Sequence, residues 1–305
     1  MKNFVLNIIA FLLFSLTFYG ATLFLWESYV PSRFKPNINY RIGVGQIFSR
    51  LSEVKNTNDI DVLFLGSSRA YRSFDPRTYS SLGLKTFNLG SSSQTPIQTN
   101  LLLKRYLEDL NPKLVVFEIN PLVFTLDGVE SSLQIIANDR NDLHSFEMAL
   151  KLNNIKTYNT LMYGITRDLL NLNESFTEPY KEGIDTYIPG GFVERELLHF
   201  KPTSFEKKEI SISRSQLDTF SEIISSLKSK DIEVILVYAP IAPSKYSSYL
   251  NMWYFDSLMT SYSEYYNFNE INTLKDSLHF YDENHMNQLG VELFSKELSG
   301  ILNAR

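Results

Sequence analysis

Two serines follow a short apolar run, and their position suggests nucleophilic catalysis. Residues 62–65 (VLFL) predict a buried strand that ends at Gly66, and Ser67, Ser68 and Arg69 come next. Open α/β sheets bind ligands at the carboxyl ends of their strands, where these side chains would lie. The alternative is a simple turn, because Gly and Ser are ordinary turn residues. A serine nucleophile also needs a base, so the choice depends on the rest of the chain.

One of the four histidines, His285, follows Asp282 by three residues. Asp282 and His285 stand just before an apolar-periodic segment that predicts a helix, with Val291, Phe294, Leu298 and Ile301 on its core face. At this spacing the carboxylate can hold the imidazole Nδ1–H while Nε2 faces a nucleophile. The local alternative is that Asp282 caps the helix and His285 is a partly exposed helix residue.

The order of these motifs resembles the SGNH hydrolase superfamily of GDSL-type esterases and acyltransferases. Three segments carry the resemblance: residues 64–76 (FLGSSRAYRSFDP), 87–96 (FNLGSSSQTP) and 281–290 (YDENHMNQLG). They are most similar to the membrane-anchored bacterial branch, which includes the D-alanyl transfer protein DltD and the alginate acetylation proteins. The resemblance extends from about Asp61 to Leu298, with a central insertion left unmatched.

The resemblance implies a role for each matching residue. Ser68 would be the nucleophile, and Asp282 and His285 would complete a catalytic triad. The backbone N–H groups of Ser68 and Gly90, together with the Asn120 side chain, would form the oxyanion hole. Donors aimed at a developing oxyanion lower the barrier by several kcal/mol, on the order of 3 kcal/mol for one donor.

The motifs also depart from the family pattern. Ser67 takes the place of Asp in Gly-Asp-Ser, and residues 118–121 (EINP) stand in place of Gly-x-Asn-Asp. Asn120 is therefore either an oxyanion donor or a plain strand-end residue. Arg69 is a surface cation, a partner for Asp75, or a substrate-binding residue that holds a carboxylate or phosphate.

The surrounding elements predict an α/β fold. Near-continuous apolar strands alternate with helices of apolar periodicity, which is typical of a parallel sheet covered on both faces. This is the three-layer α/β/α arrangement of SGNH and flavodoxin-like proteins. We expect strands within residues 62–65, 85–93, 112–121 and 232–240, and helices within residues 45–55, 76–82, 96–110 and 216–230.

The expected domain organisation has three parts. Residues 1–27 form a transmembrane anchor, 28–58 a polar neck, and 59–305 the α/β domain. Within that domain the alternation of strands and helices stops at about 122–210, which predicts an insertion with some helix within residues 146–172.

The anchor rests on residues 4–26, which are 23 residues without a charge. As a helix they would be about 35 Å long, enough to span a hydrocarbon core. A cleaved secretory signal is the alternative, although its apolar region would be shorter and Gly20-Ala21 is a poor cleavage site. Because long domains translocate largely regardless of charge, we expect the domain to lie outside the cytoplasm.

Composition excludes several function classes. The net charge is −5 and no basic run is present, so no nucleic-acid partner is expected. The absence of cysteine excludes disulfides, thiolate catalysis and Cys-based zinc sites. Asp282 and His285 alone make a poor zinc site, so we expect neither metal nor cofactor.

These observations predict a membrane-anchored serine esterase or O-acyltransferase that acts on an envelope polysaccharide or related acylated polymer through an acyl-Ser68 intermediate. Hydrolase and transferase share that intermediate, so the choice between them stays open. The alternative is a catalytically silent protein that binds a glycan or assists a membrane-bound O-acyltransferase. The departures from the family pattern at Ser67 and at residues 118–121 are consistent with that alternative.

Overall fold

The computed structural model describes residues 1–271 and 273–304, and its contacts divide the chain into two compact units. The smaller unit holds residues 1–42 and 132–177, and the larger holds residues 43–131 and the chain from 178 onward. The expected boundaries at 59 and at 122–210 therefore do not coincide with this division. The reason is that α2 (Ile47–Val54) buries Ile47 and Leu51 in the larger unit, so part of the expected neck is folded.

A five-stranded parallel sheet in the order β2-β1-β3-β7-β8 forms the centre of the larger unit. Its strands are β1 (Val62–Leu65), β2 (Thr86–Asn88), β3 (Leu114–Glu118), β7 (Glu233–Tyr238) and β8 (Glu264–Asn267). Chain order reverses at β1, so the carboxyl ends of β1 and β3 flank the topological switch point. Ligands of open α/β sheets bind at this point.

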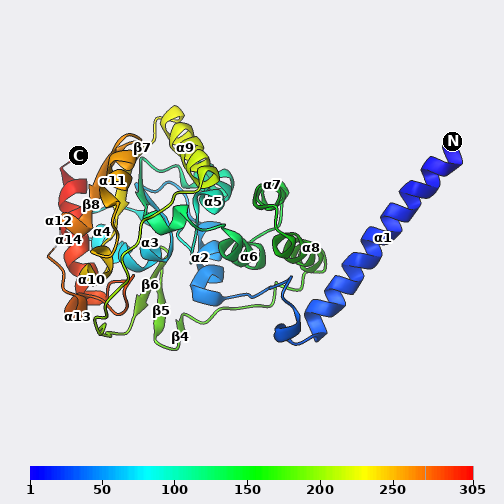
Figure 1. The fold of residues 1–305 in the computed structure, drawn as a ribbon, viewed down its shortest axis with the longest axis horizontal. Coiled ribbons are helices and arrows are strands. Elements are labelled where there is room, and N and C mark those ends of the chain that lie inside the picture. The colour runs from blue at the N-terminus through cyan, green and yellow to red at the C-terminus, as the bar shows by residue number, and fades with distance from the viewer. Residues whose placement is uncertain (272, 305) are drawn as a thin grey trace. The chain divides into compact units, whose positions relative to one another are not determined.

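Helices cover both faces of this sheet, which gives the expected three-layer α/β/α fold (Figure 1). One face packs against α3 (Ser68–Ser73), α4 (Pro76–Ser80) and α14 (Gln288–Asn303), with Ala70, Tyr79 and Phe294 in a shared core. The other face meets α9 (Arg214–Ser229), whose Phe220 ring lies 5.5 Å from that of Phe117, and α5 (Pro96–Leu110) packs along α9.

The larger unit also has elements that the sequence reading missed. Strand β8 is short and polar, and β4 (Lys181–Glu182), β5 (Asp185–Ile188) and β6 (Phe192–Arg195) form a small antiparallel sheet. A Gly-Gly turn joins β5 to β6, with φ of 97° at Gly190 and 89° at Gly191. This is a strong hairpin signal that can be read from the sequence. The remaining short elements are η2 (Val44–Gln46), η3 (Pro121–Phe124), α10 (Pro243–Tyr246), α11 (Met252–Thr260), α12 (Phe268–Ile271) and α13 (Asp276–His279).

The smaller unit is helical. It contains α1 (Lys2–Tyr29), η1 (Ser32–Phe34), α7 (Leu143–Leu152) and α8 (Ile155–Leu169), and α6 (Val129–Asn138) leads into it. The helical part expected within 146–172 consists of two helices, because Asn153 ends α7 with φ of 45° and the Asn154 side chain caps α8. By length and composition α1 could cross a membrane.

Candidate active site

Ser68 is placed by the junction between β1 and α3. Gly66 has a φ of 140°, and a Cβ there would lie 2.8 Å from the Cβ and the carbonyl oxygen of Glu118. Only glycine fits such a backbone. Ser67 then caps α3, since its Oγ accepts from the Arg69 N–H at 3.4 Å. Ser68 is consequently the first residue of α3, at the carboxyl end of the sheet.

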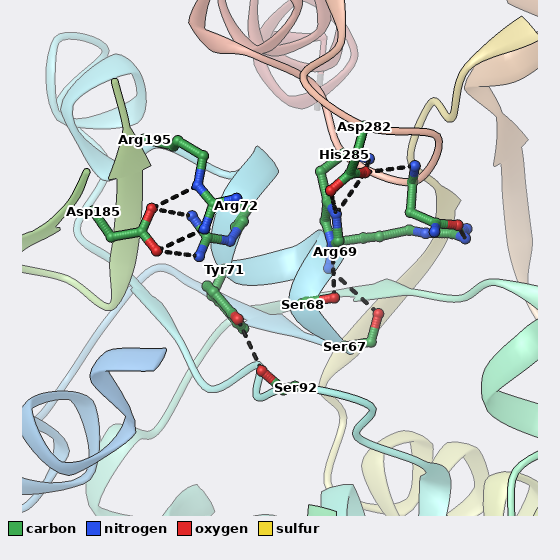
Figure 2. A network of polar contacts seen from close by, with 11 residues as sticks. Ser67, Ser68, Arg69, Tyr71, Arg72, Ser92, Asp185, Arg195, Asp282 and His285 are labelled. Atoms are coloured by element: carbon green, nitrogen blue, oxygen red, sulfur yellow. Dashed lines mark hydrogen bonds and ion pairs between the residues drawn. The ribbon is translucent and has the colours of Figure 1, made fainter. Parts of the chain in front are cut away.

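His285 lies against Ser68, although the two are 217 residues apart in the chain. Ser68 Oγ and His285 Nε2 are 2.8 Å apart, and His285 Nδ1 lies 2.9 Å from Asp282 Oδ2 (Figure 2). The Asp282 carboxylate also accepts the backbone N–H of His285 at 2.8 Å, which holds the two side chains in one turn. The three residues that were proposed as a triad are therefore hydrogen-bonded in series.

The surroundings of this triad favour a neutral imidazole. Burial lowers the pKa of His285, and the positive charges of Arg69 and Arg72 lower it further against the opposing effect of Asp282. Burial is the largest single effect and would raise the pKa of Asp282, but the hydrogen bond and charge of His285 together with the backbone N–H groups of Asn284 and His285 lower that pKa overall. A neutral imidazole beside an ionised carboxylate is the state in which His285 can accept a proton from Ser68.

The expected oxyanion donors differ in what they contact. The Ser68 N–H lies in the first turn of α3, where backbone N–H groups have no hydrogen-bond acceptor within the helix. Gly90 lies beside this junction, since a Cβ there would be 2.8 Å from the Ser67 carbonyl oxygen, but its N–H donates to Asn88 Oδ1 at 2.9 Å. Asn120 Nδ2 donates to Ser67 Oγ at 3.2 Å. The oxyanion roles of Gly90 and Asn120 remain predictions, and the geometry gives each group another partner.

The two departures from the family pattern contact each other. Ser67 Oγ donates to Glu118 Oε2 at 3.2 Å, and both side chains are buried. Burial raises the pKa of Glu118, although the nearby Arg69 opposes this. A carboxyl group thus lies behind the turn that carries Ser68, contributed by β3 instead of by residue 67. Asn120 joins the same cluster, and its Oδ1 accepts the Leu122 N–H at 3.1 Å.

Arg69 is buried, so it is neither a surface cation nor a partner of Asp75. Its exposed fraction is 4%, and Asp75 pairs with Arg77 at 2.7 Å. Arg69 Nη2 donates to Asn284 Oδ1 at 3.0 Å, next to His285 in the chain. Among the described residues, Arg69 Nη1 has no hydrogen-bond partner. A buried guanidinium with a free donor is suited to a bound anion.

A second charged network near His285 was missed by the sequence reading. Asp185 accepts two hydrogen bonds from Arg72 and two from Arg195, at 2.7–3.0 Å (Figure 2). Burial alone would raise the pKa of Asp185, but these hydrogen bonds lower it. The Arg195 guanidinium lies 4.6 Å over the Tyr281 ring, and that ring stacks on His285 with centroids 5.5 Å apart.

Part of this network had a readable signal. Arg72 is four residues after Ser68 and therefore on the same helix, and Tyr281 immediately precedes Asp282. Asp185 and Arg195 are directly paired across the β5–β6 hairpin, which becomes visible once the Gly-Gly turn is recognised. The other histidines lie elsewhere: His144 contacts Glu147, and His279 Nδ1 accepts the Lys275 N–H. Within the described residues, no three or more His, Cys, Asp or Glu side chains are grouped as metal ligands.

Comparisons with known proteins add a weak structural likeness. No family model matches the chain, and no curated protein matches it. Similar solved structures include two proteins from Bacteroides. A candidate acylhydrolase from Bacteroides fragilis NCTC 9343 is 15% identical, with a TM-score of 0.43, and the match covers 87% of this chain and 99% of that one. A GDSL-like lipase from Bacteroides thetaiotaomicron VPI-5482 is 13% identical, with a TM-score of 0.43, covering 84% and 97%. Similarities of this size carry no conclusion about chemistry, which rests on the site itself.

Proposed function

We propose that this protein is a membrane-anchored SGNH-type serine esterase or O-acyltransferase that forms an acyl-Ser68 intermediate. The observation that carries the proposal is the continuous series from Asp282 through His285 to Ser68, with contacts of 2.9 and 2.8 Å. A serine hydroxyl is a weak nucleophile unless a base lies within hydrogen-bonding reach, and an oriented base is what this series provides.

In the first half-reaction, Ser68 Oγ attacks the carbonyl carbon of an ester as its proton passes to His285 Nε2. Asp282 keeps the imidazole oriented and stabilises the imidazolium that forms. The carbonyl oxygen takes up the negative charge, and the Ser68 N–H is the donor closest to it in the chain. When the intermediate collapses, the bond to the alkoxy oxygen breaks and His285 returns its proton to that oxygen. The products are acyl-Ser68 and an alcohol.

In the second half-reaction, an acceptor hydroxyl attacks acyl-Ser68 with His285 again as the base. Water as acceptor releases a carboxylic acid, and a sugar hydroxyl receives the acyl group. Both routes use the same catalytic groups and return Ser68 to its free hydroxyl form. The site is therefore suited to either hydrolysis or acyl transfer. We propose an envelope polysaccharide or related acylated polymer as substrate, since a tethered enzyme suits a polymer held near the membrane.

Arg69 supports a substrate that carries a negative charge. Its unpartnered Nη1 is buried, and its guanidinium lies 5.7 Å over the Tyr238 ring at the end of β7. A carboxylate or phosphate of the substrate would satisfy this donor, because guanidinium groups bind such anions in a fixed geometry.

Membrane anchoring is supported by the packing of α1. Leu23 is 8% exposed and joins Tyr163 of α8 in a small core, so the carboxyl-terminal part of α1 belongs to a folded unit. A signal peptide that is removed would leave α8 without these contacts. We propose that α1 remains attached and that the site lies outside the cytoplasm.

A fluorophosphonate probe tests the enzyme, because it labels only an activated serine. We expect wild-type protein to gain one adduct by intact mass, Ser68→Ala to gain none, and Ser67→Ala to keep the adduct. Ser67 provides a matched control, since its hydroxyl is adjacent but is held by Glu118. Labelling that survives Ser68→Ala would show that the nucleophile is another residue.

The alternative is a catalytically silent protein that binds an acylated glycan or assists a membrane-bound O-acyltransferase. It is favoured by the partners of Gly90 and Asn120, whose donors are occupied by Asn88 and Ser67. Folded wild-type protein that takes no label and hydrolyses no small acetyl ester would support this alternative and exclude the enzyme.

A further inference from the structure

The α7–α8 hairpin of the smaller unit has exposed apolar side chains around its tip. Phe146, Leu150 and Ile155 are 51%, 56% and 55% exposed. The opposite side of α7 is packed, since Met148 and Ala149 are buried. The exposed residues are therefore additional to those that hold the hairpin together, and exposed apolar clusters of this kind mark interaction sites.

Helix α8 packs against α1, and the contacts between them progress in the same direction along both helices, with Tyr163 meeting both Phe24 and Ser28. Tyr19 Oη donates to Asn159 Oδ1 at 2.8 Å, and the Phe24 ring stacks on Tyr163 with centroids 5.4 Å apart. Later residues of α1 thus meet later residues of α8. It follows that the amino-terminal end of α8, where the hairpin turns, points toward the amino-terminal end of α1.

The depth of the hairpin tip follows from helix geometry. Ile155 precedes Asn159 by four residues, at most about 6 Å along the direction of α1, which places it between the levels of Ser15 and Tyr19. A hydrocarbon core needs about 20 helical residues, so a span counted from Phe4, the first residue of the uncharged run, would reach about Leu23. Ile155 is then level with the last part of that span. Interfacial helices bury their apolar faces about 5–10 Å into this boundary.

We propose that the hairpin tip, residues 146–156, is a second membrane contact that lies in the surface of the bilayer crossed by α1. The inference rests on the proposed anchoring of α1. Lys151 and Lys156 are at the same tip, where cationic side chains suit anionic headgroups. A helix and a hairpin together fix the tilt of this unit on the membrane, which a single span does not.

Because the chain has no cysteine, single-cysteine variants of the full chain can test this contact. Leu150→Cys, Ile155→Cys and Leu169→Cys would each be labelled with the environment-sensitive dye NBD and reconstituted into phosphatidylcholine–phosphatidylglycerol vesicles. Leu169 is the matched control, since it is 79% exposed at the other end of α8. We expect blue-shifted emission and several-fold stronger quenching by nitroxide lipids at 150 and 155 than at 169.

The outcomes distinguish this proposal from the anchor on which it rests. Protein that floats with the vesicles while all three labels report water overturns the hairpin contact and leaves the anchor intact. Equal quenching at 150, 155 and 169 also overturns it, because it shows nonspecific adsorption. Protein that does not float with the vesicles overturns the anchor and the hairpin contact together.

Discussion

At the scale of single residues, the charges around His285 set the pH at which it can work. Arg69 and Arg72 both lower the pKa of the imidazole, adding to the effect of burial. His285 must be neutral to accept the Ser68 proton, so activity rises with pH through this pKa. The acid limb of kcat/KM should therefore lie below about pH 6.5, the ordinary value for histidine.

Substitution of Arg69 should move that limb in a predictable direction. Arg69→Gln removes a cation, so His285 keeps its proton to higher pH and the limb moves upward. Arg69→Lys keeps the charge, and the limb should stay near the wild-type position. The measurement is the pH profile of kcat/KM on a neutral acetyl ester. Identical profiles for Gln and wild type would show that Arg69 does not act on His285.

The same pair of variants also tests whether Arg69 binds an anionic group of the substrate. Both should raise KM severalfold for an ester that carries a carboxylate, because Lys lacks the planar fork of Arg. KM for the neutral ester should change little. If all KM values stay unchanged, the free Nη1 donor of Arg69 has no role in substrate binding.

At the scale of elements, the junction between β1 and α3 depends on Gly66. Gly66→Ala forces a Cβ into a backbone with φ of 140° and to 2.8 Å from Glu118. We expect a loss of about 2–5 kcal/mol in the free energy of unfolding, from strain and overpacking together. Urea unfolding measures the loss, and probe labelling of Ser68 should fall with it.

Gly83→Ala is the matched control for this change. Gly83 also has a positive φ, 79°, but a Cβ there would meet no atom within 4 Å. It should cost only the backbone strain, about 1–2 kcal/mol. Equal losses for the two variants would mean that the contact between Gly66 and Glu118 is not tight.

The end of β3 makes a second element-scale prediction. Asn120→Ala removes one hydrogen bond that Ser67 Oγ accepts and leaves the Leu122 N–H without its partner, so we expect a loss of about 1–3 kcal/mol in unfolding free energy. Turnover should change only a few-fold, because the amide contacts Ser67. Thermal melts and kcat measurements distinguish a structural role of Asn120 from a role as an oxyanion donor. A drop in kcat of about 10²–10³ with unchanged stability would instead establish Asn120 as an oxyanion donor.

At the scale of the whole molecule, α1 serves both as the proposed anchor and as part of a core. Leu23 and Phe24 pack with Tyr163, while the residues before Ser15 are exposed. The two roles can be separated by shortening the chain to different points.

A chain that starts at Tyr19 should leave the membrane and remain folded. One that starts at Val30 also loses Leu23 and Phe24, about 1.5–3 kcal/mol of burial each. We expect full-length protein to resist carbonate extraction, and amide exchange in α8 to become faster only in the shorter of the two truncated chains. Similar exchange in both would contradict the packing of α1 on α8.

The sequence by itself determined the features that depend on local pattern. Apolar runs predicted four of the five strands of the central sheet, with β8 missed, and apolar periodicity predicted the helix over 96–110, whose bounds match those of α5. Charge-free length predicted α1, and the spacing of Asp282 and His285 predicted a pair that the structure holds at 2.9 Å. Each of these signals lies within one segment, where dihedral preferences and burial act directly.

Only the tertiary structure decided how distant segments meet. It brought Glu118 to Ser67 across 51 residues, and it placed the Arg72–Asp185–Arg195 network beside the Tyr281 ring that stacks on His285. It also directed the Gly90 N–H to Asn88 and the Asn120 amide to Ser67. The physical reason is that strand order and helix packing decide which chain ends become neighbours. A residue's type shows what it can bond, and the fold decides which partner it has.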